Sequence, residues 1–314
     1  MSATTLIYSK GNINYLGEFY KMLRKASEVL QKLENPHVRN LFWALASPNT
    51  LAEEEFPQLF PDHLMQQLWM ENEDFFYALD EAPHTLENYT ERYSQGRLGH
   101  YFEALLRYFI EKSPSTESVL SNFQINEDKT TIGEIDLVFD WNGTRYHWEI
   151  AIKYFAMINE GLTWREWIGP SGDDRLDIKL NHVFEHQIPL ITHPQVQRIV
   201  GENVQSYLFL KGKFFANTTY PDWINKKQEV GIYLREKEIR AFIKKEQITE
   251  IYQLERPHFL ADFEKVQDKF KIVIDELQHQ RTPLLTPDNP SVFYRMRRGK
   301  KYIDVVMVAN CWPR

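Results

Sequence analysis

The chain has 314 residues, which is enough for one large domain or two ordinary ones. Hydrophobic residues make up 43% and charged residues 26%, a composition that is typical of a folded globular protein and excludes a disordered chain. The 37 Lys and Arg residues against 44 Asp and Glu residues give a net charge of −7, which argues against a strongly basic, indiscriminate nucleic-acid binder.

The sequence also bears on the cellular compartment. Cys311 is the only cysteine, so no intramolecular disulfide can form, and this fits a reducing compartment. The first 20 residues lack the basic segment and apolar run of a signal peptide. No window approaches the roughly 18 apolar residues that a membrane span needs. We therefore expect a cytoplasmic protein that is not inserted in a membrane.

The N-terminal region, residues 1–90, is predicted to be helical. Apolar residues recur at helical spacing over 13–33, and a second helix is predicted over 36–46, where Ser47 and Pro48 end it. A third helical stretch is predicted over 62–80.

The centre of the chain has an α/β pattern. An amphipathic helix is predicted first, then three strands, a helix and a strand, over residues 97–112, 118–126, 131–141, 145–155, 173–187 and 204–212. Asn142 and Gly143, between the second and third strands, are a strong signal for a two-residue hairpin turn. These elements define a predicted core over residues 91–215.

The C-terminal region, residues 216–314, is predicted to be mixed α+β. A strand is predicted over 229–234, mostly helical structure over 236–280, and a final hairpin around Gly299. No clear linker separates this region from the centre, so we expect it to pack on the core.

Three ionisable residues come close together in the predicted central hairpin. Strand alternation places Glu149 and Lys153 on one face of the third strand, and Asp136 comes from the neighbouring strand. Two carboxylates and a lysine beside apolar residues are costly unless something compensates their charge. A divalent cation such as Mg²⁺ would do so, because Mg²⁺ prefers carboxylate oxygens. Such a site suits hydrolysis at phosphorus, with Lys153 orienting or deprotonating the attacking water.

The segments GEIDL at 133–137 and WEIAIK at 148–153 resemble the core of the PD-(D/E)XK nuclease superfamily, and the order of elements around them is similar too. The resemblance covers about 97–212, roughly a third of the chain. It implies an αβββαβ core with helical N-terminal and mixed C-terminal extensions. It also implies a nuclease that uses Mg²⁺ or Mn²⁺ and acts on DNA or RNA.

The resemblance assigns roles to individual residues. Asp136 and Glu149 would ligate the metal, Glu103 on the preceding helix would be a further acidic ligand, and Lys153 would be catalytic. The sequence departs from the superfamily pattern at the lysine, which follows Glu149 by four residues instead of two. Four residues of strand span about 13 Å, against about 7 Å for two. This departure leaves open a second hypothesis, a catalytically degenerate protein of the same fold that binds nucleic acid or a protein partner.

More of the chain resembles an uncharacterised bacterial family of unknown function that has been linked to this nuclease fold. The segments that carry this second resemblance are residues 38–47, 167–170 and 174–180. It implies a fold and a candidate site, but no substrate.

Two groups of basic residues are candidates for contact with nucleic acid. Arg175 and Lys179 share a helix face. If that face is directed towards the metal site, they would contact a phosphate. Otherwise they are part of a charged surface. The densest basic run has aromatic neighbours, which suits a nucleic-acid backbone and stacked bases, but it also fits a solvated hairpin tip. It consists of Arg295, Arg297, Arg298, Lys300 and Lys301.

Two further motifs have alternative interpretations. His182 to His186 match H-x-x-E-H, an inverted zinc-protease motif, but the sequence marks no third ligand, so this helix could equally pack on the sheet. Trp164 and Trp167 could stack a base, although such tryptophans more often anchor a loop.

Overall fold

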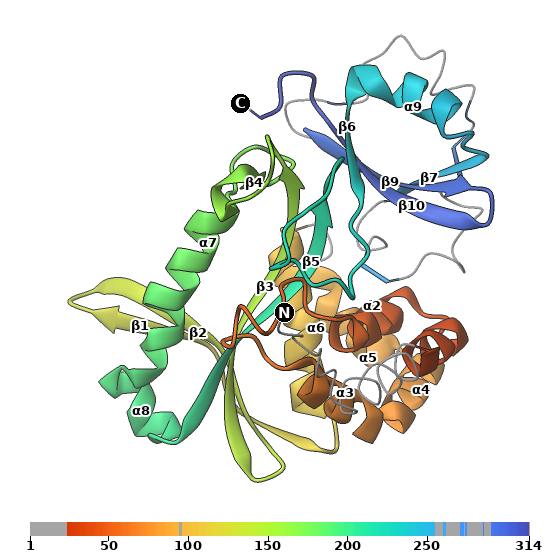
Figure 1. The fold of residues 1–314 in the computed structure, drawn as a ribbon. Coiled ribbons are helices and arrows are strands. Elements are labelled where there is room, and N and C mark those ends of the chain that lie inside the picture. Colours follow the sequence, from red (N-terminus) through yellow and green to blue (C-terminus); the bar gives the residue numbers. More distant parts are fainter. Residues whose placement is uncertain are drawn as a thin grey trace, which may run out of the picture.

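The computed structural model describes residues 24–93, 96–254, 260–261, 271–272, 274, 285 and 290–313. These residues form a mixed α/β fold, in which N-terminal helices and a second sheet pack around a central sheet (Figure 1). The helix predicted over 13–33 lies partly outside the described residues, and within them residues 24–32 are helical. In this described part of the chain, no helix is long and apolar enough to cross a bilayer.

The N-terminal region is helical, as predicted. Its described helices after residue 32 are α2 (Pro36–Ala46), α3 (Asp62–Glu71), α4 (Glu73–Glu81) and α5 (His84–Thr90), followed by the short turn η1 (Glu91–Tyr93). The side chain of Asn35 caps α2 by accepting hydrogen bonds from the backbone N–H groups of His37 and Val38. The single helix predicted over 62–80 is broken at Asn72, whose amide group donates to the carbonyl oxygen of Leu68.

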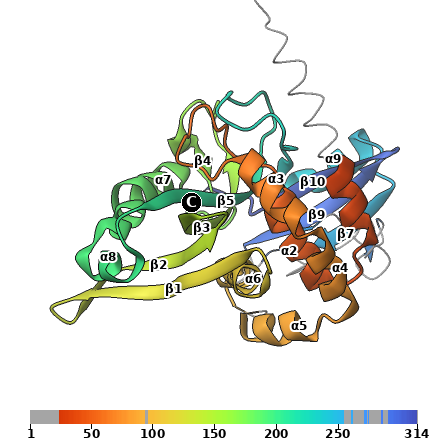
Figure 2. The same ribbon diagram turned by 90° about the horizontal axis from the view of Figure 1, so that it is seen from below.

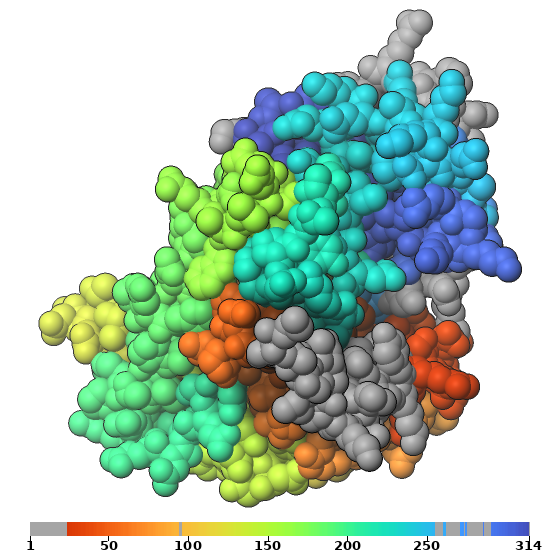
Figure 3. Space-filling model, viewed as in Figure 1, coloured from red at the N-terminus to blue at the C-terminus, as the bar shows by residue number. Residues whose placement is uncertain are grey.

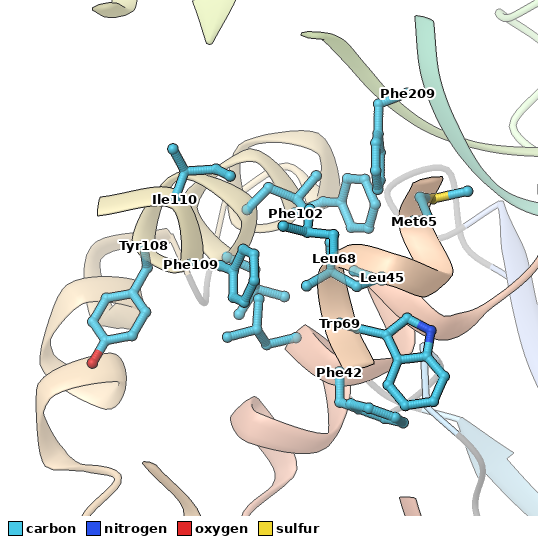
Figure 4. Packing of buried hydrophobic residues seen from close by; sticks show 14 of the residues in the cluster. Phe42, Leu45, Met65, Leu68, Trp69, Phe102, Tyr108, Phe109, Ile110 and Phe209 are labelled. Carbon is cyan, nitrogen blue, oxygen red and sulfur yellow. The ribbon is translucent and has the colours of Figure 1, made fainter. Parts of the chain in front are cut away.

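Aromatic side chains join these helices to α6 (Leu98–Lys112) and to the central sheet (Figure 4). The ring centroids of Phe42 and Trp69 lie 5.3 Å apart, and those of Phe102 and Phe209 lie 6.2 Å apart. Aromatic pairs at such distances contribute about 0.5–1.5 kcal/mol beyond the burial of their surface. This packing fixes α6 against the sheet, and α6 carries Glu103.

The central sheet contains β1 (Thr116–Glu127), β2 (Thr130–Trp141), β3 (Thr144–Met157), β4 (Trp167–Ile168) and β5 (Val204–Phe215). The strands lie in the order β1-β2-β3-β4, and β5 pairs with β3 in parallel. Asn142 and Gly143 have φ angles of 50° and 73°, as a tight turn of the predicted kind requires. The predicted order of helix, three strands, helix and strand is present, and β4 is an addition to it.

Helices cover both faces of the central sheet. Figure 2 shows the strands between α6 on one side and α7 (Leu176–His182) on the other. Trp148 and Ile150 of β3 pack in the cluster that includes α6, whereas Ala151 packs with Leu180 of α7. Alternation therefore directs Glu149, the residue between Trp148 and Ile150, to the α7 face.

The helix predicted over 173–187 begins three residues later and changes its pitch. After α7 the chain makes a π-helical turn, η3 (Val183–Gln187), and then a 3₁₀ turn, η4 (Ile188–Thr192). The helix α8 (Pro194–Val200) follows and packs against the hairpin of β1 and β2. The tip of this hairpin, yellow in Figure 3, projects from the edge of the molecule.

The C-terminal region builds a second sheet with the strand order β6-β10-β9-β7-β8. Its strands are β6 (Ile232–Arg235), β7 (Glu250–Leu254), β8 (Lys271–Ile272), β9 (Ser291–Arg298) and β10 (Lys301–Val308), and its helical elements are η5 (Glu236–Glu238) and α9 (Ile239–Lys245). The hairpin predicted around Gly299 is present. The helical prediction over 236–280 is wrong at β7, because pairing with β9 and the burial of Ile251 favour a strand there. Much of the remainder of 236–280 lies outside the described residues.

Candidate functional site

The candidate site lies where β2 separates from β3. The two strands pair from Trp141 and Thr144 as far as Leu137 and Trp148, and there the pairing ends. Asp136 is the first residue of β2 beyond this point, and its Oδ2 accepts a hydrogen bond of 2.8 Å from the backbone N–H of Ile150. A carboxylate therefore takes the place of a backbone partner where the strands separate. We call this point, with Asp136 on β2 and Glu149 on β3, the fork.

Glu149 lies beside Asp136, at the next position of β3. Only 1% of its surface is exposed. Its Oε2 atom is buried and has no hydrogen-bond partner among the residues that the structure describes. A buried carboxylate without full hydrogen bonding is costly in its charged form, so this group must be protonated or must meet a cation.

The two carboxyl groups of the fork perturb each other. Burial, followed by the charge of Asp136, raises the pKa of Glu149 to about 9. Burial raises the pKa of Asp136 to about 7, although the hydrogen bond from Ile150 acts in the opposite direction. The pair therefore holds at least one proton at neutral pH, and a bound cation could replace that proton.

The charge of a third carboxyl group, Glu103 on α6, acts on the fork. Burial and then the charge of Glu134 raise the pKa of Glu103, and the charge of Glu103 in turn raises the pKa of both Asp136 and Glu149. Arg107, one turn further along α6, partly offsets the effect on Glu103. The guanidinium group of Arg107 is held by the hydroxyl group of Tyr89, at 2.7 Å.

Two lysines occupy different places around the fork. Lys153, which the resemblance marks as catalytic, donates a hydrogen bond of 2.8 Å to Oδ2 of Asp174. Lys179 on α7 is the cation that lowers the pKa of both Asp136 and Glu149, and its own pKa is lowered by burial. Lys179, which the sequence marks only as a possible phosphate contact, thus acts on the carboxyl pair through its charge, and α7 packs on the face of the sheet to which Glu149 points.

The donor set of the fork suits a magnesium ion. In the described part of the chain, no group of three or more His, Cys, Asp or Glu side chains is arranged to hold a metal by itself. Mg²⁺ does not need such a group, because proteins usually bind it through one or two carboxylates together with waters and substrate phosphates. The unpartnered Oε2 of Glu149 and the proton retained by the pair fit this mode of binding.

The other residues of α7 and η3 show no comparable arrangement. The guanidinium group of Arg175 forms an ion pair of 2.7 Å with Asp177, two residues further along. The exposed rings of His182 and His186 have centroids 5.5 Å apart. No third ligand joins them to form a metal site among the residues described.

Acidic partners accompany the basic run on β9 and β10. The ion pairs join Arg295 to Asp304 at 3.7 Å, Arg297 to Glu250 at 3.1 Å and Arg298 to Glu246 at 2.6 Å. Lys300 and Lys301 are exposed at the turn. The run belongs to the second sheet, whereas the fork belongs to the central sheet.

The two tryptophans that follow β3 pack against other parts of the fold. Trp167 is fully buried, and its Nε1 donates a hydrogen bond of 2.9 Å to the carbonyl oxygen of Gly161. Trp164, in the turn η2 (Trp164–Glu166), packs against Phe56 with 5.3 Å between ring centroids. In these positions both side chains anchor the loop.

A family model described as "Domain of unknown function (DUF1853)" matches residues 39–298. The chain belongs to this family. The DUF1853 match spans α6, the whole central sheet and α7, and so contains every residue of the fork. No curated protein and no solved structure matches the chain. The geometry of the fork is therefore the feature of this DUF1853 protein that bears on its function.

Proposed function

We propose that this DUF1853 protein is a metal-dependent nuclease with a PD-(D/E)XK-like core, and that it hydrolyses phosphodiester bonds in DNA or RNA. The observation that carries the proposal is the fork. Asp136 lies at the point where β2 leaves β3, next to a buried Glu149 whose Oε2 has no partner among the described residues. The charges of Glu103 and Lys179 act on this pair, and the helices that carry them, α6 and α7, lie on opposite sides of the sheet (Figure 2).

Asp136 and Glu149 would hold Mg²⁺ or Mn²⁺, with Glu103 assisting. The ion would polarise a phosphoryl oxygen and make a water molecule more acidic. The hydrogen bond from Ile150 fixes Oδ2 of Asp136, so Oδ1 would be the oxygen available to the ion. Burial of Glu149 excludes water from its carboxylate and strengthens its interaction with a cation.

Lys179 would take part in the chemical step. As the attacking water bonds to phosphorus and the P–O ester bond breaks, the water would lose a proton to Lys179, and the leaving oxygen would take a proton from solvent water. Because burial lowers the pKa of Lys179, a neutral amine can accept the first proton, and the charged form can stabilise the phosphate. Lys153, paired with Asp174, lies at the rim, where it can contact the substrate backbone.

The first test is a cleavage assay on labelled DNA and RNA, single- and double-stranded, with Mg²⁺ or Mn²⁺. We expect Asp136→Asn to reduce cleavage at least about 100-fold, because it removes a charge that the ion requires. The matched control is Asp140→Asn, on the same strand, where Asp140 pairs with Arg145 outside the fork. The control should cleave as the wild type does. Equal cleavage by wild type and Asp136→Asn would contradict the proposal.

The second candidate function is a catalytically degenerate protein of the same fold that binds nucleic acid or a protein partner. The observation that favours it is the ion pair between Lys153 and Asp174, which occupies the lysine of the superfamily pattern. This candidate predicts that nucleic-acid or partner binding survives chelation and that no metal supports turnover. Metal-dependent turnover that is lost in Asp136→Asn would exclude it.

A further inference from the structure

The helix that carries Lys179 continues into a π-helical turn, and this turn changes which side chains share a face. Lys179 and Gln187 are eight residues apart. In a continued α-helix that separation is about 2.2 turns, so the two side chains would lie about 80° apart around the axis. The π-helical turn Val183–Gln187 is wider, because its hydrogen bonds run from i to i+5, and it takes up this difference. Lys179 Nζ consequently donates a hydrogen bond of 2.9 Å to Oε1 of Gln187.

Packing on both sides holds the π-helical turn in place. Val183, its first residue, is fully buried in the cluster beneath α7. Beyond the turn, Leu190 packs against Gly133 of β2. A Cβ atom added at Gly133 would lie only 2.3 Å from Cδ1 of Leu190. Gly133 is three residues before Asp136. The turn is therefore clamped between α7 and the strand that forms the fork, and π-helical turns of this kind occur frequently at functional sites.

We propose that Gln187 is a positioning residue, whose side-chain oxygen holds the Lys179 ammonium group beside Asp136 and Glu149. The inference rests on the proposed function, in which Lys179 acts on the scissile phosphate. The charged groups that act on Lys179 include Glu149, Lys153, Asp136 and Asp174, and its charge acts in turn on Glu103 and His182. The oxygen of Gln187 adds a fixed neutral acceptor to this set and determines where the ammonium group lies.

The first experiment does not depend on activity. The side-chain resonance of Lys179 is followed by NMR against pH in the full chain, without metal, and is assigned by its loss in Lys179→Met. In Gln187→Leu the pKa of Lys179 should fall by about one unit, because a charged hydrogen bond is lost. In Gln187→Glu the pKa should rise. The control Gln195→Leu, which removes a bond from α8 to the carbonyl oxygen of Asn126, should leave it unchanged. An unchanged pKa in Gln187→Leu overturns the inference.

The second experiment uses cleavage kinetics. Gln187→Leu should lower kcat about tenfold with little change in KM, and should displace the pH profile by the shift found by NMR. Gln187→Glu, which keeps an acceptor, should restore most of kcat. A normal kcat and pH profile in Gln187→Leu overturns the positioning role. If the wild type cleaves nothing, the proposed function fails, while the NMR result still decides whether Gln187 holds Lys179.

Discussion

The burial of Glu149 in the middle of β3 costs folding free energy. Its neighbours Trp148, Ile150, Ala151 and Ile152 are apolar and buried, and an apolar side chain at position 149 would avoid the cost of burying a carboxyl group. A role in stabilising the fold does not explain why a glutamate stands here, because its Oε2 has no hydrogen-bond partner in the described part of the chain. The cation that we propose at the fork would account for it.

The raised pKa of Glu149 makes a prediction about stability. The folded group has a pKa of about 9, against about 4.3 in an unfolded chain, so between these values the folded state holds a proton that the unfolded state has lost. The resulting stability is fully present below about pH 4 and is lost as pH rises towards 9. Without metal, the free energy of unfolding of the wild type should therefore fall between pH 6 and pH 8, with Glu149 contributing up to about 1.4 kcal/mol per pH unit.

Urea unfolding in EDTA at pH 6 and pH 8 measures this effect. Glu149→Gln should be more stable than the wild type at pH 8 and should show a smaller fall, with the remainder due to Asp136, whose pKa is also raised. Asp140→Asn serves as the control. Because Arg145 lowers the pKa of Asp140, this carboxyl group is ionised throughout the range from pH 6 to pH 8 and should not contribute to the fall. Parallel declines in the wild type and Glu149→Gln would show that Glu149 is not protonated in the folded state.

At the scale of the elements, the backbones of β3 and β5 lie very close together next to Lys153. Gly212 of β5 has a φ angle of 135°, and a Cβ there would lie 1.7 Å from the carbonyl oxygen of Lys153. Gly212→Ala must therefore strain its own backbone and displace that of β3. We expect it to lower the free energy of unfolding by more than about 2 kcal/mol, since strain and displaced packing add.

A matched substitution separates the two effects. Gly143, in the turn between β2 and β3, also has a positive φ, but nothing lies within 4 Å of its added Cβ. Gly143→Ala should cost only the backbone strain, about 1 kcal/mol. Urea unfolding of both variants makes the comparison. Equal costs would show that the contact between β5 and Lys153 is looser than described.

The sequence predicts much of the central sheet because its signals are local. Asn142 and Gly143 specify the turn, and alternation then places Glu149 and Lys153 on one face of the third strand, with Asp136 on the neighbouring strand. It does not predict the fork itself, because periodicity reports which face a residue occupies and not where two strands part. Nor does it predict the role of Lys179. The helix changes its pitch after α7, where residues far apart in the sequence, such as Leu190 and Gly133, are in contact, and local sequence patterns do not report such contacts.

At the scale of the whole molecule, the charge distribution limits where nucleic acid could bind. The net charge is −7, so a phosphate backbone needs a local cationic surface. The arginines of the basic run have carboxylate partners, and the run lies on the second sheet, blue in Figure 3, away from the green α7 segment. Lys179, in contrast, lies beside the fork, where the scissile phosphate would be.

These positions predict different effects on binding. In an Asp136→Asn background, reversal of both tip charges by Lys300→Glu and Lys301→Glu should change the affinity for labelled DNA less than about twofold. This expectation follows because the tip belongs to the second sheet, whereas the scissile phosphate would bind at the fork in the central sheet. Lys179→Met should weaken binding and reduce the slope of log affinity against log salt by about one, as expected for one lost phosphate contact. Fluorescence anisotropy at several salt concentrations measures both. Loss of binding in the double reversal, with normal binding by Lys179→Met, would place the nucleic-acid interface on the turn between β9 and β10.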